Sequence, residues 1–364
     1  MPNVKLQDLT KYFGRVRALE GINLDIKDGE YIALLGPSGC GKTTLINCIT
    51  GIVHPTRGEI FINGIDVKDL SIEKRNFAMV FQSIALFPHM TVEQNVSYGP
   101  FVNDLSREEQ SEISEKMLKL VDLIDQKQLK PRQLSGGAQQ KTSVARALAT
   151  NERLLILDEP ISALDYKVRV SLRYELRQLV KDLGLTAIHI THDQEEAMSI
   201  ADRIVVMRAG KIIELGTPQN LYENPQTLFT MNFIGECNFI EGFVKEKKSA
   251  NRYNIEFRNC HHLVVQGQNG KFKEGEGVVV AFRPESIIIS FEDQDNTLEG
   301  KIRKERFAGG YYRYNADLLT EDSIIIDSRN PLNRKGNIFI YLNPQRTRIF
   351  AAPEFGLRKV LSLE

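Results

Sequence analysis

The chain has 364 residues, and at about 150 residues per domain this length predicts two domains. Lysine and arginine together number 47, as do aspartate and glutamate, so the chain lacks the net positive charge that holds nucleic acid by counterion release. With 42% hydrophobic and 26% charged residues, the composition excludes a disordered or fibrous protein. No apolar stretch reaches the roughly 20 residues that cross a bilayer, and the amino terminus lacks a secretory signal pattern, so we expect a cytoplasmic location.

The first motif lies between a predicted strand and a predicted helix. Residues 3–28 alternate apolar and polar positions, and the apolar run 31–35 then predicts a buried strand. It leads into Gly36-Pro-Ser-Gly-Cys-Gly-Lys42-Thr43, which fits G-x-x-x-x-G-K-[ST] and precedes the helical run 44–50. Glycines let backbone N–H groups face phosphate oxygens, while Lys42 can reach the outer phosphates and Thr43 can ligate Mg²⁺. A phosphate-binding loop is therefore favoured over an ordinary strand–helix turn.

Two helices are predicted in the middle of the chain. Apolar residues recur at helical spacing among charges over 106–126, which indicates an amphipathic helix. A second helical pattern follows Leu134-Ser135-Gly136-Gly137, where Ser135 can cap the helix and both glycines expose backbone N–H groups at its positive end. Alone, this motif would indicate only a capped helix. Next to a phosphate loop it predicts a second phosphate contact.

Acidic residues end the next apolar strand. The run 154–157 leads directly into Asp158 and Glu159, and a helical pattern separates it from another apolar run at 187–190. This order is typical of buried parallel strands joined by helical crossovers. An aspartate at such a strand end can hold Mg²⁺, and the following carboxylate can polarise an attacking water.

The last third of the chain has a different sequence pattern, dominated by short β-rich segments. A hairpin is predicted over 203–216, with Ala209-Gly210 as its turn, and short β-rich segments follow as far as 337–342. We therefore predict one domain over residues 1–238 and, over residues 239–364, a small all-β domain or a pair of barrels.

Five motifs in one order carry a family resemblance over about residues 4–235. They are the phosphate loop, Gln82 in MVFQ, LSGG, LLILDEP with the closely following Ser162-Ala-Leu-Asp165, and His192 in ITHDQEEA. Together they resemble the nucleotide-binding subunit of ABC transporters. FRPES at 282–286 resembles the accessory oligonucleotide-fold domain of importer ATPases of the maltose-transporter type. The implied fold is an α/β P-loop NTPase domain, with antiparallel β and helical subdomains, followed by a small all-β oligonucleotide-fold-like regulatory domain.

The resemblance also implies roles for single residues. Two subunits would close head to tail on two ATP molecules, each completing the other's site with its Ser-Gly-Gly segment, and Asp165 would link the opposing sites. Phe13 matches the position expected to stack on adenine; Tyr12 could substitute for it, and either aromatic could instead serve packing. The implied catalytic set is Glu159 as general base with His192, Gln82 and Lys42, and the implied Mg²⁺ ligands are Thr43, Gln82 and Asp158. The implied ATP-binding set is Phe13, Gly36, Pro37, Ser38, Gly39, Cys40, Gly41, Lys42, Thr43, Thr44, Ser135, Gly136, Gly137 and Asp165.

Two positions depart from the family pattern. Importer relatives commonly carry glutamine where this chain has Ala138 and arginine where it has Lys141. Neither change removes the Ser-Gly-Gly contacts, so activity is still expected. The other histidines, His189 among them, occur in no motif and receive no role.

These features predict an ATP-hydrolysing peripheral subunit of an importer at the cytoplasmic face of the cell membrane. Its partners would be a second copy of the chain, separate membrane permease subunits that contact residues 83–100, and indirectly an external solute-binding protein. A sugar or oligosaccharide is the first expectation for the solute, with polyamine, iron, sulfate or molybdate as alternatives. An exporter subunit, a regulatory nucleotide-binding module and a soluble ATPase that remodels nucleic acid or ribosomes are further alternatives, although no stable nucleic-acid partner is expected.

Overall fold

The computed structural model describes residues 3–249, 251–257, 262–266, 272–290, 292, 296–319, 322–332 and 337–362. The chain forms two compact units, Met1–Pro218 and Gln219–Glu364. The helix α8 (Pro218–Glu223) begins at the boundary between the units, and α9 (Leu228–Phe233) lies in the second unit. The functional division predicted at 238/239 stays a prediction.

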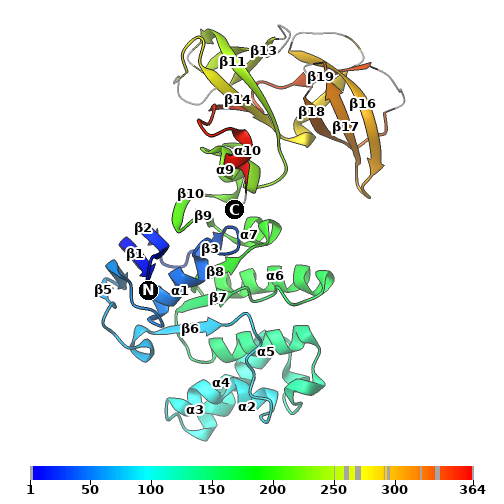
Figure 1. The fold of residues 1–364 in the computed structure, drawn as a ribbon. Coiled ribbons are helices and arrows are strands. Elements are labelled where there is room, and N and C mark those ends of the chain that lie inside the picture. The colour runs from blue at the N-terminus through cyan, green and yellow to red at the C-terminus, as the bar shows by residue number, and fades with distance from the viewer. Residues whose placement is uncertain are drawn as a thin grey trace. The chain divides into compact units, whose positions relative to one another are not determined.

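A six-stranded sheet organises the first unit, in the order β10-β9-β3-β8-β7-β6 (Figure 1). The strands from β6 to β9 are parallel, as the apolar runs predicted, and the β9–β10 hairpin adds an antiparallel edge. Alternate residues of each central strand enter two different cores, so both faces of the sheet are covered. The strands are β3 (Tyr31–Leu35), β6 (Phe77–Val80), β7 (Leu154–Asp158), β8 (Thr186–Thr191), β9 (Arg203–Arg208) and β10 (Lys211–Gly216).

An antiparallel sheet and α1 pack on one face of this sheet. The antiparallel sheet has the order β2-β1-β4-β5, and its inward residues share a core with α1 and with alternate residues of β3 and β7. The other face carries the core that α4, α5 and α6 line. The bounds are β1 (Val4–Phe13), β2 (Val16–Ile26), β4 (Arg57–Ile62), β5 (Ile65–Asp66), α1 (Lys42–Thr50), α6 (Tyr166–Asp182) and α7 (Gln194–Ile200).

Short helices form the expected helical part of the first unit: α2 (Val92–Val96), α3 (Tyr98–Val102), α4 (Arg107–Leu120) and α5 (Gly136–Leu148). A reciprocal capping box between Ser106 and Glu109 begins α4. The helix predicted over 106–126 ends earlier, at Leu120. Asp122 adopts a positive φ of 57°, which stops the helix, and only a short 3₁₀ turn follows at Ile124–Gln126.

Two five-stranded antiparallel sheets form most of the second unit and share one core. Their orders are β13-β12-β11-β14-β20 and β15-β19-β16-β17-β18, which confirms the small all-β domain. The strands are β11 (Asn238–Ser249), β12 (Arg252–Glu256), β13 (His262–Gln266), β14 (Gly277–Phe282), β15 (Ile287–Ser290), β16 (Thr297–Phe307), β17 (Tyr312–Leu318), β18 (Ser323–Ser328), β19 (Asn337–Leu342) and β20 (Thr347–Ala351), and α10 spans Leu357–Leu361.

Among the helices that the structure describes, none combines the length and the apolarity needed to cross a membrane.

A buried arginine secures the far end of α1. Arg75 is 1% exposed, and its guanidinium donates to the carbonyl oxygens of Cys48 and Ile49 in the last turn of α1, at 2.9 and 2.8 Å. It also donates to the carbonyls of Leu70 and Lys68, at 3.1 Å each. Burial lowers the pKa of Arg75. The cation satisfies helix-end carbonyls that have no intrahelical partner and complements the negative end of the helix.

We expect Arg75→Met to lower the free energy of unfolding of the first unit by about 3 kcal/mol, because buried carbonyls lose their donors. Denaturant unfolding followed by circular dichroism measures this change. Arg57→Met, at an exposed position, is the matched control and should change stability by less than about 0.5 kcal/mol. Equal effects of the two substitutions would contradict this assignment.

Candidate nucleotide site

The phosphate loop is wedged between two strands. It joins β3 to α1, and Gly39 and Gly41 have φ of 77° and 107°, in the left-handed region that favours glycine. A Cβ on Gly36 would lie 2.4 Å from the carbonyl oxygen of Met207, and one on Gly41 would lie 2.6 Å from that of Ala18. Glycine is therefore required at both positions, and the backbone N–H groups at the start of α1 stay open to an anion.

Lys42 begins α1 and folds back into the loop. Its side chain is 7% exposed, and its ammonium donates to the carbonyl oxygens of Gly36 and Pro37, at 2.6 and 3.0 Å. Thr43, in the first turn of the helix, is exposed. The loop thus presents a cation, a helix amino terminus and a hydroxyl at one place, a combination that binds phosphate.

Acidic residues lie at the neighbouring strand end. In the sheet, Asp158 is paired in register with Ile190, whose carbonyl accepts from the backbone N–H of Glu159 at 3.0 Å. Burial, reinforced by the charge of Glu159, raises the pKa of Asp158, while Lys42 is among the charges that oppose the increase. Glu159 itself has a positive φ of 45°. The carboxyl ends of β3, β7 and β8 therefore bring the loop and the carboxylates to one edge.

Two other predicted residues, Gln82 and His192, contact the Glu159 carboxylate. The side-chain amide of Gln82, which follows β6, donates to one carboxylate oxygen of Glu159 at 3.0 Å. The Nδ1 atom of His192, which follows β8, lies 3.3 Å from the other. His192 is 58% exposed at its side chain, so it is available to a bound nucleotide. This arrangement can place a water molecule against a phosphate and accept its proton.

The oxygen donors here fit Mg²⁺. Thr43 offers a hydroxyl, Gln82 an amide oxygen and Asp158 a carboxylate, all hard ligands of the kind Mg²⁺ prefers. Mg²⁺ is usually held by one or two protein groups together with substrate phosphates, and these residues can supply such groups. When bound, Mg²⁺ neutralises phosphate charge during the transfer.

The Ser-Gly-Gly segment lies in a separate groove. Ser135 caps α5 by accepting from the backbone N–H of Ala138 at 3.3 Å, and Asp165 caps α6 by accepting from that of Val168 at 3.2 Å. Ser135, Gly136, Gly137 and Asp165 line one groove of about 500 Å³. The phosphate loop, Asp158 and Glu159 do not contribute to this groove. The structure therefore divides the predicted ATP-binding set between two places on the first unit.

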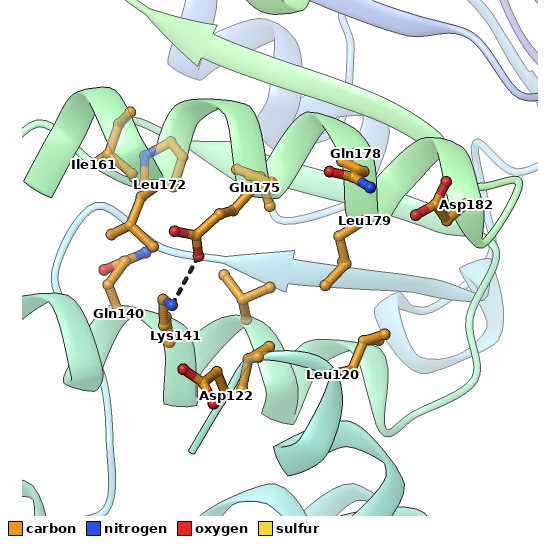
Figure 2. Close-up of a pocket in the computed structure, with 14 residues that line it drawn as sticks. Leu120, Asp122, Gln140, Lys141, Ile161, Leu172, Glu175, Gln178, Leu179 and Asp182 are labelled. Atoms are coloured by element: carbon orange, nitrogen blue, oxygen red, sulfur yellow. Dashed lines mark ion pairs between the residues drawn. The ribbon is translucent and has the colours of Figure 1, made fainter.

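Lys141, one of the departures from the family pattern, bridges two helices. Its ammonium on α5 lies 2.7 Å from the Glu175 carboxylate on α6, across a pocket of about 270 Å³ (Figure 2). Ala138, the other departure, is buried at the first turn of α5. The smaller residue leaves the cap by Ser135 intact.

The remaining predicted residues occupy different environments. Phe13, at the end of β1, is 49% exposed, and the Lys11 ammonium lies 4.9 Å from its ring centre. Its exposure suits stacking on a base, a role that stays a prediction. Cys40 is buried, and burial raises its thiol pKa. Among the other loop residues, Pro37 and Thr44 are half-buried, whereas Ser38 and Gly39 are exposed.

Sequence reasoning missed His189. This fully buried side chain of β8 contacts Tyr31 and Glu196, three residues before His192 in the chain. A histidine inside the apolar run TAIHIT is the one signal that could have drawn attention to it.

The parallel sheet, the glycine-lined phosphate loop and the carboxylates at the adjoining strand end place the first unit among the P-loop NTPases. Residues 19–162 match the family model described as "ABC transporter". The chain is 44% identical over 304 residues to the spermidine/putrescine import ATP-binding protein PotA of Haemophilus ducreyi, covering 82% of this chain and 80% of the relative. It is 37% identical over 364 residues to the Fe(3+) ions import ATP-binding protein FbpC of Fusobacterium nucleatum, covering 99% and 95%.

A solved structure of an ATP-binding cassette is also similar to this chain. The dimeric ATP-binding cassette MJ0796, in a post-hydrolysis state bound to ADP and Pi, matches with 34% sequence identity and a TM-score of 0.53, covering 59% of this chain and 98% of that chain. The chain belongs to the ABC transporter family, as an ATP-binding subunit of importer type. It is an ATPase that uses ATP with Mg²⁺.

Substitutions at this site should separate ATP binding from ATP hydrolysis. Lys42→Ala should weaken ATP binding, because it removes the cation of the loop. Glu159→Gln should keep ATP binding but lower the turnover number at least about 100-fold, because the amide cannot accept a proton. Binding of a fluorescent ATP analogue and release of phosphate measure these effects, with the exposed Glu195→Gln as control. Full turnover in Glu159→Gln would exclude it as the base.

Proposed function

We propose that this chain is the peripheral ATP-hydrolysing subunit of an importer, bound to separate permease subunits at the cytoplasmic face of the membrane. The observation that supports this proposal is that the predicted ATP-binding residues lie in two separate places on the first unit. Because Ser135 to Gly137 lie in a groove apart from the phosphate loop, one copy can complete the nucleotide site of another. ATP binding would thus be converted into closure of two subunits, a motion that permease subunits can use.

The catalytic roles follow from the contacts around Glu159. Glu159 acts as general base, while Gln82 and His192, which contact its carboxylate, position the attacking water and the γ-phosphate. Lys42 and the start of α1 stabilise the charge that develops on the phosphate oxygens. Thr43, Gln82 and Asp158 hold Mg²⁺ together with the nucleotide.

The segment 83–100 is the proposed contact with the permease. Its Phe87 ring lies 4.6 Å from that of Tyr98 and 5.4 Å from the guanidinium of Arg146 on α5, centre to centre. Arg146 also donates to the Ala85 carbonyl at 2.7 Å. The segment follows Gln82 directly and is tied to the helix that Ser135 begins. A partner on this segment would therefore be connected to both halves of the nucleotide site.

For the solute, we propose a small cation. The relatives named for spermidine and putrescine import have the higher sequence identity, so a polyamine is the first candidate. Ferric iron is the second, because the relative named for Fe(3+) import matches over 99% of this chain. The sugar expected from the resemblance to maltose-type ATPases receives no support from these relatives. The regulatory role of the all-β domain stays a prediction.

The head-to-tail dimer gives a sharp test. Glu159→Gln with Mg²⁺ and ATP should sediment as a dimer, because the bound nucleotide is not consumed. Adding Ser135→Glu should abolish this dimer, because a carboxylate would face the phosphates of the other copy. The control is Ser111→Glu, an exposed serine of α4. An ATP-dependent dimer that persists with Ser135→Glu would contradict the shared site.

Uptake in the native cell tests the transport role and the solute together. Replacing the chain by Glu159→Gln should abolish uptake of labelled putrescine and spermidine, with labelled iron(III) and maltose measured in parallel. A loss for iron alone would select the second candidate, and a loss for maltose alone would overturn the small-cation proposal. Tagged Glu159→Gln, trapped with ATP, should also retain polytopic membrane proteins. Recovery of ribosomes or nucleic acid without membrane proteins would overturn the importer role.

A further inference from the structure

A cluster of ionisable side chains is sealed inside the first unit beneath the turn that carries His192. Tyr31 on β3 and His189 on β8 are fully buried, and Glu196 on α7 is 3% exposed. Burying such groups is unfavourable unless they have partners, so their presence in an otherwise apolar core requires an explanation. The predicted catalytic set includes none of these residues.

The cluster forms a continuous path of contacts that ends at that turn. The Tyr31 hydroxyl lies 2.9 Å from Nδ1 of His189, and Nε2 of His189 lies 3.0 Å from one carboxylate oxygen of Glu196. The Thr191 hydroxyl donates to the other oxygen of Glu196 at 2.5 Å. The same hydroxyl accepts from the backbone N–H of Asp193 at 3.0 Å. Since Thr191 and Asp193 flank His192, the path holds the backbone on both sides of it.

The order of donors in this path is set by its buried carboxylate. Burial acts to raise the pKa of Glu196, but His189, Thr191 and Arg173 together hold it below its ordinary value. An ionised carboxylate only accepts, so the tautomer of His189 that complements it carries its proton on Nε2, the atom that lies 3.0 Å from Glu196. Nδ1 then accepts from Tyr31, whose hydroxyl keeps its proton because burial raises its pKa well above the usual range. In this tautomer, Tyr31 donates to His189, and both His189 and Thr191 face Glu196 with a proton.

Charged groups on α6 support the same turn from another side. Arg173 is 4% exposed, and its guanidinium lies 3.5 Å from a carboxylate oxygen of Asp193, which caps α7. Arg169 lies 3.7 Å from that oxygen. The turn between β8 and α7 is thus fixed by strand, helix and cap together, whereas the His192 side chain is 58% exposed and has little packing of its own.

We infer that Tyr31, His189 and Glu196 are positioning residues that hold the turn so that His192 faces Glu159 and the phosphate. The inference rests on the proposed role of His192 in hydrolysis. None of the three touches the nucleotide. They act through Thr191, and their effect falls on the rate of hydrolysis, because small displacements of a catalytic group slow the chemical step more than they weaken binding.

The first test removes one buried oxygen and leaves the shape unchanged. In Tyr31→Phe, we expect the turnover number to fall about fivefold, with the KM for ATP changed less than about twofold, because His189 loses the donor that fixes its tautomer. The matched control is Tyr314→Phe in the second unit, another fully buried tyrosine, whose hydroxyl accepts from the backbone N–H of Leu332 at 2.9 Å. It should leave turnover unchanged.

A double-mutant cycle separates positioning from general destabilisation. If Tyr31 acts through His192, the loss caused by Tyr31→Phe should shrink to less than about twofold in a His192→Ala background. Single-turnover hydrolysis with enzyme in excess measures the slow variants. An equal loss in both backgrounds would overturn the inference and leave Tyr31 a purely structural residue.

A second pair of variants cuts the path at the turn, should Tyr31→Phe fold poorly. Thr191→Val keeps the branched shape in the strand but removes the hydroxyl, and it should lower turnover with little change in KM. Thr191→Ser should restore turnover. Failure of serine to rescue, or normal turnover in Thr191→Val, would overturn the inference. Absence of hydrolysis by the unmodified chain would instead contradict the ATPase, so the two failures are distinguishable.

Discussion

The tight contact between the phosphate loop and the strands around it is the constraint on which the first unit depends. Gly36 approaches the Met207 carbonyl and Gly41 the Ala18 carbonyl at distances that leave no space for a Cβ. Gly210, in the β9–β10 turn, approaches Ala18 equally closely and donates its backbone N–H to the Cys40 carbonyl at 3.0 Å. The hairpin therefore supports the loop, and Gly210, far from Gly36 and Gly41 in sequence, is required for the same close approach.

This anchoring decides where the chemistry can occur. Because the loop is fixed at the carboxyl end of β3, groups that act on a bound phosphate must come from neighbouring strand ends. Gln82, Glu159 and His192 follow β6, β7 and β8, and they meet although each belongs to a different part of the sequence. Arg75 binds the carbonyl groups at the other end of α1. The helix that begins at the phosphate loop is therefore fixed at both of its ends.

Sequence alone predicts the parts of this structure that local patterns encode. The strand, loop and helix around Lys42 follow from glycine spacing and an apolar run, and the parallel strands follow from similar runs. The early end of α4 was missed because Asp122 takes a left-handed conformation that composition does not reveal. The contact between Tyr31 and His189 joins residues 158 positions apart, and its polar atoms are matched only once the strands are aligned. For the solute, sequence analysis predicted polyamine and iron only as alternatives to a sugar, because the nucleotide site contains no group that selects it.

The buried carboxylate of Glu196 is hard to explain by stability. Replacing buried ionic groups by apolar side chains of similar volume is often neutral or stabilising, so a core of this size could dispense with them. A hydroxyl and a carboxylate, however, form a hydrogen bond, which fixes the direction of a contact as well as its distance. An apolar pair does not. The Thr191 hydroxyl donates to Glu196 and accepts from the backbone N–H of Asp193, so the backbone is held on both sides of His192. On our inference, the cost of burying Glu196 is offset by the position it gives to the turn that carries His192, so this cluster serves the hydrolysis of ATP and not the folding of the sheet.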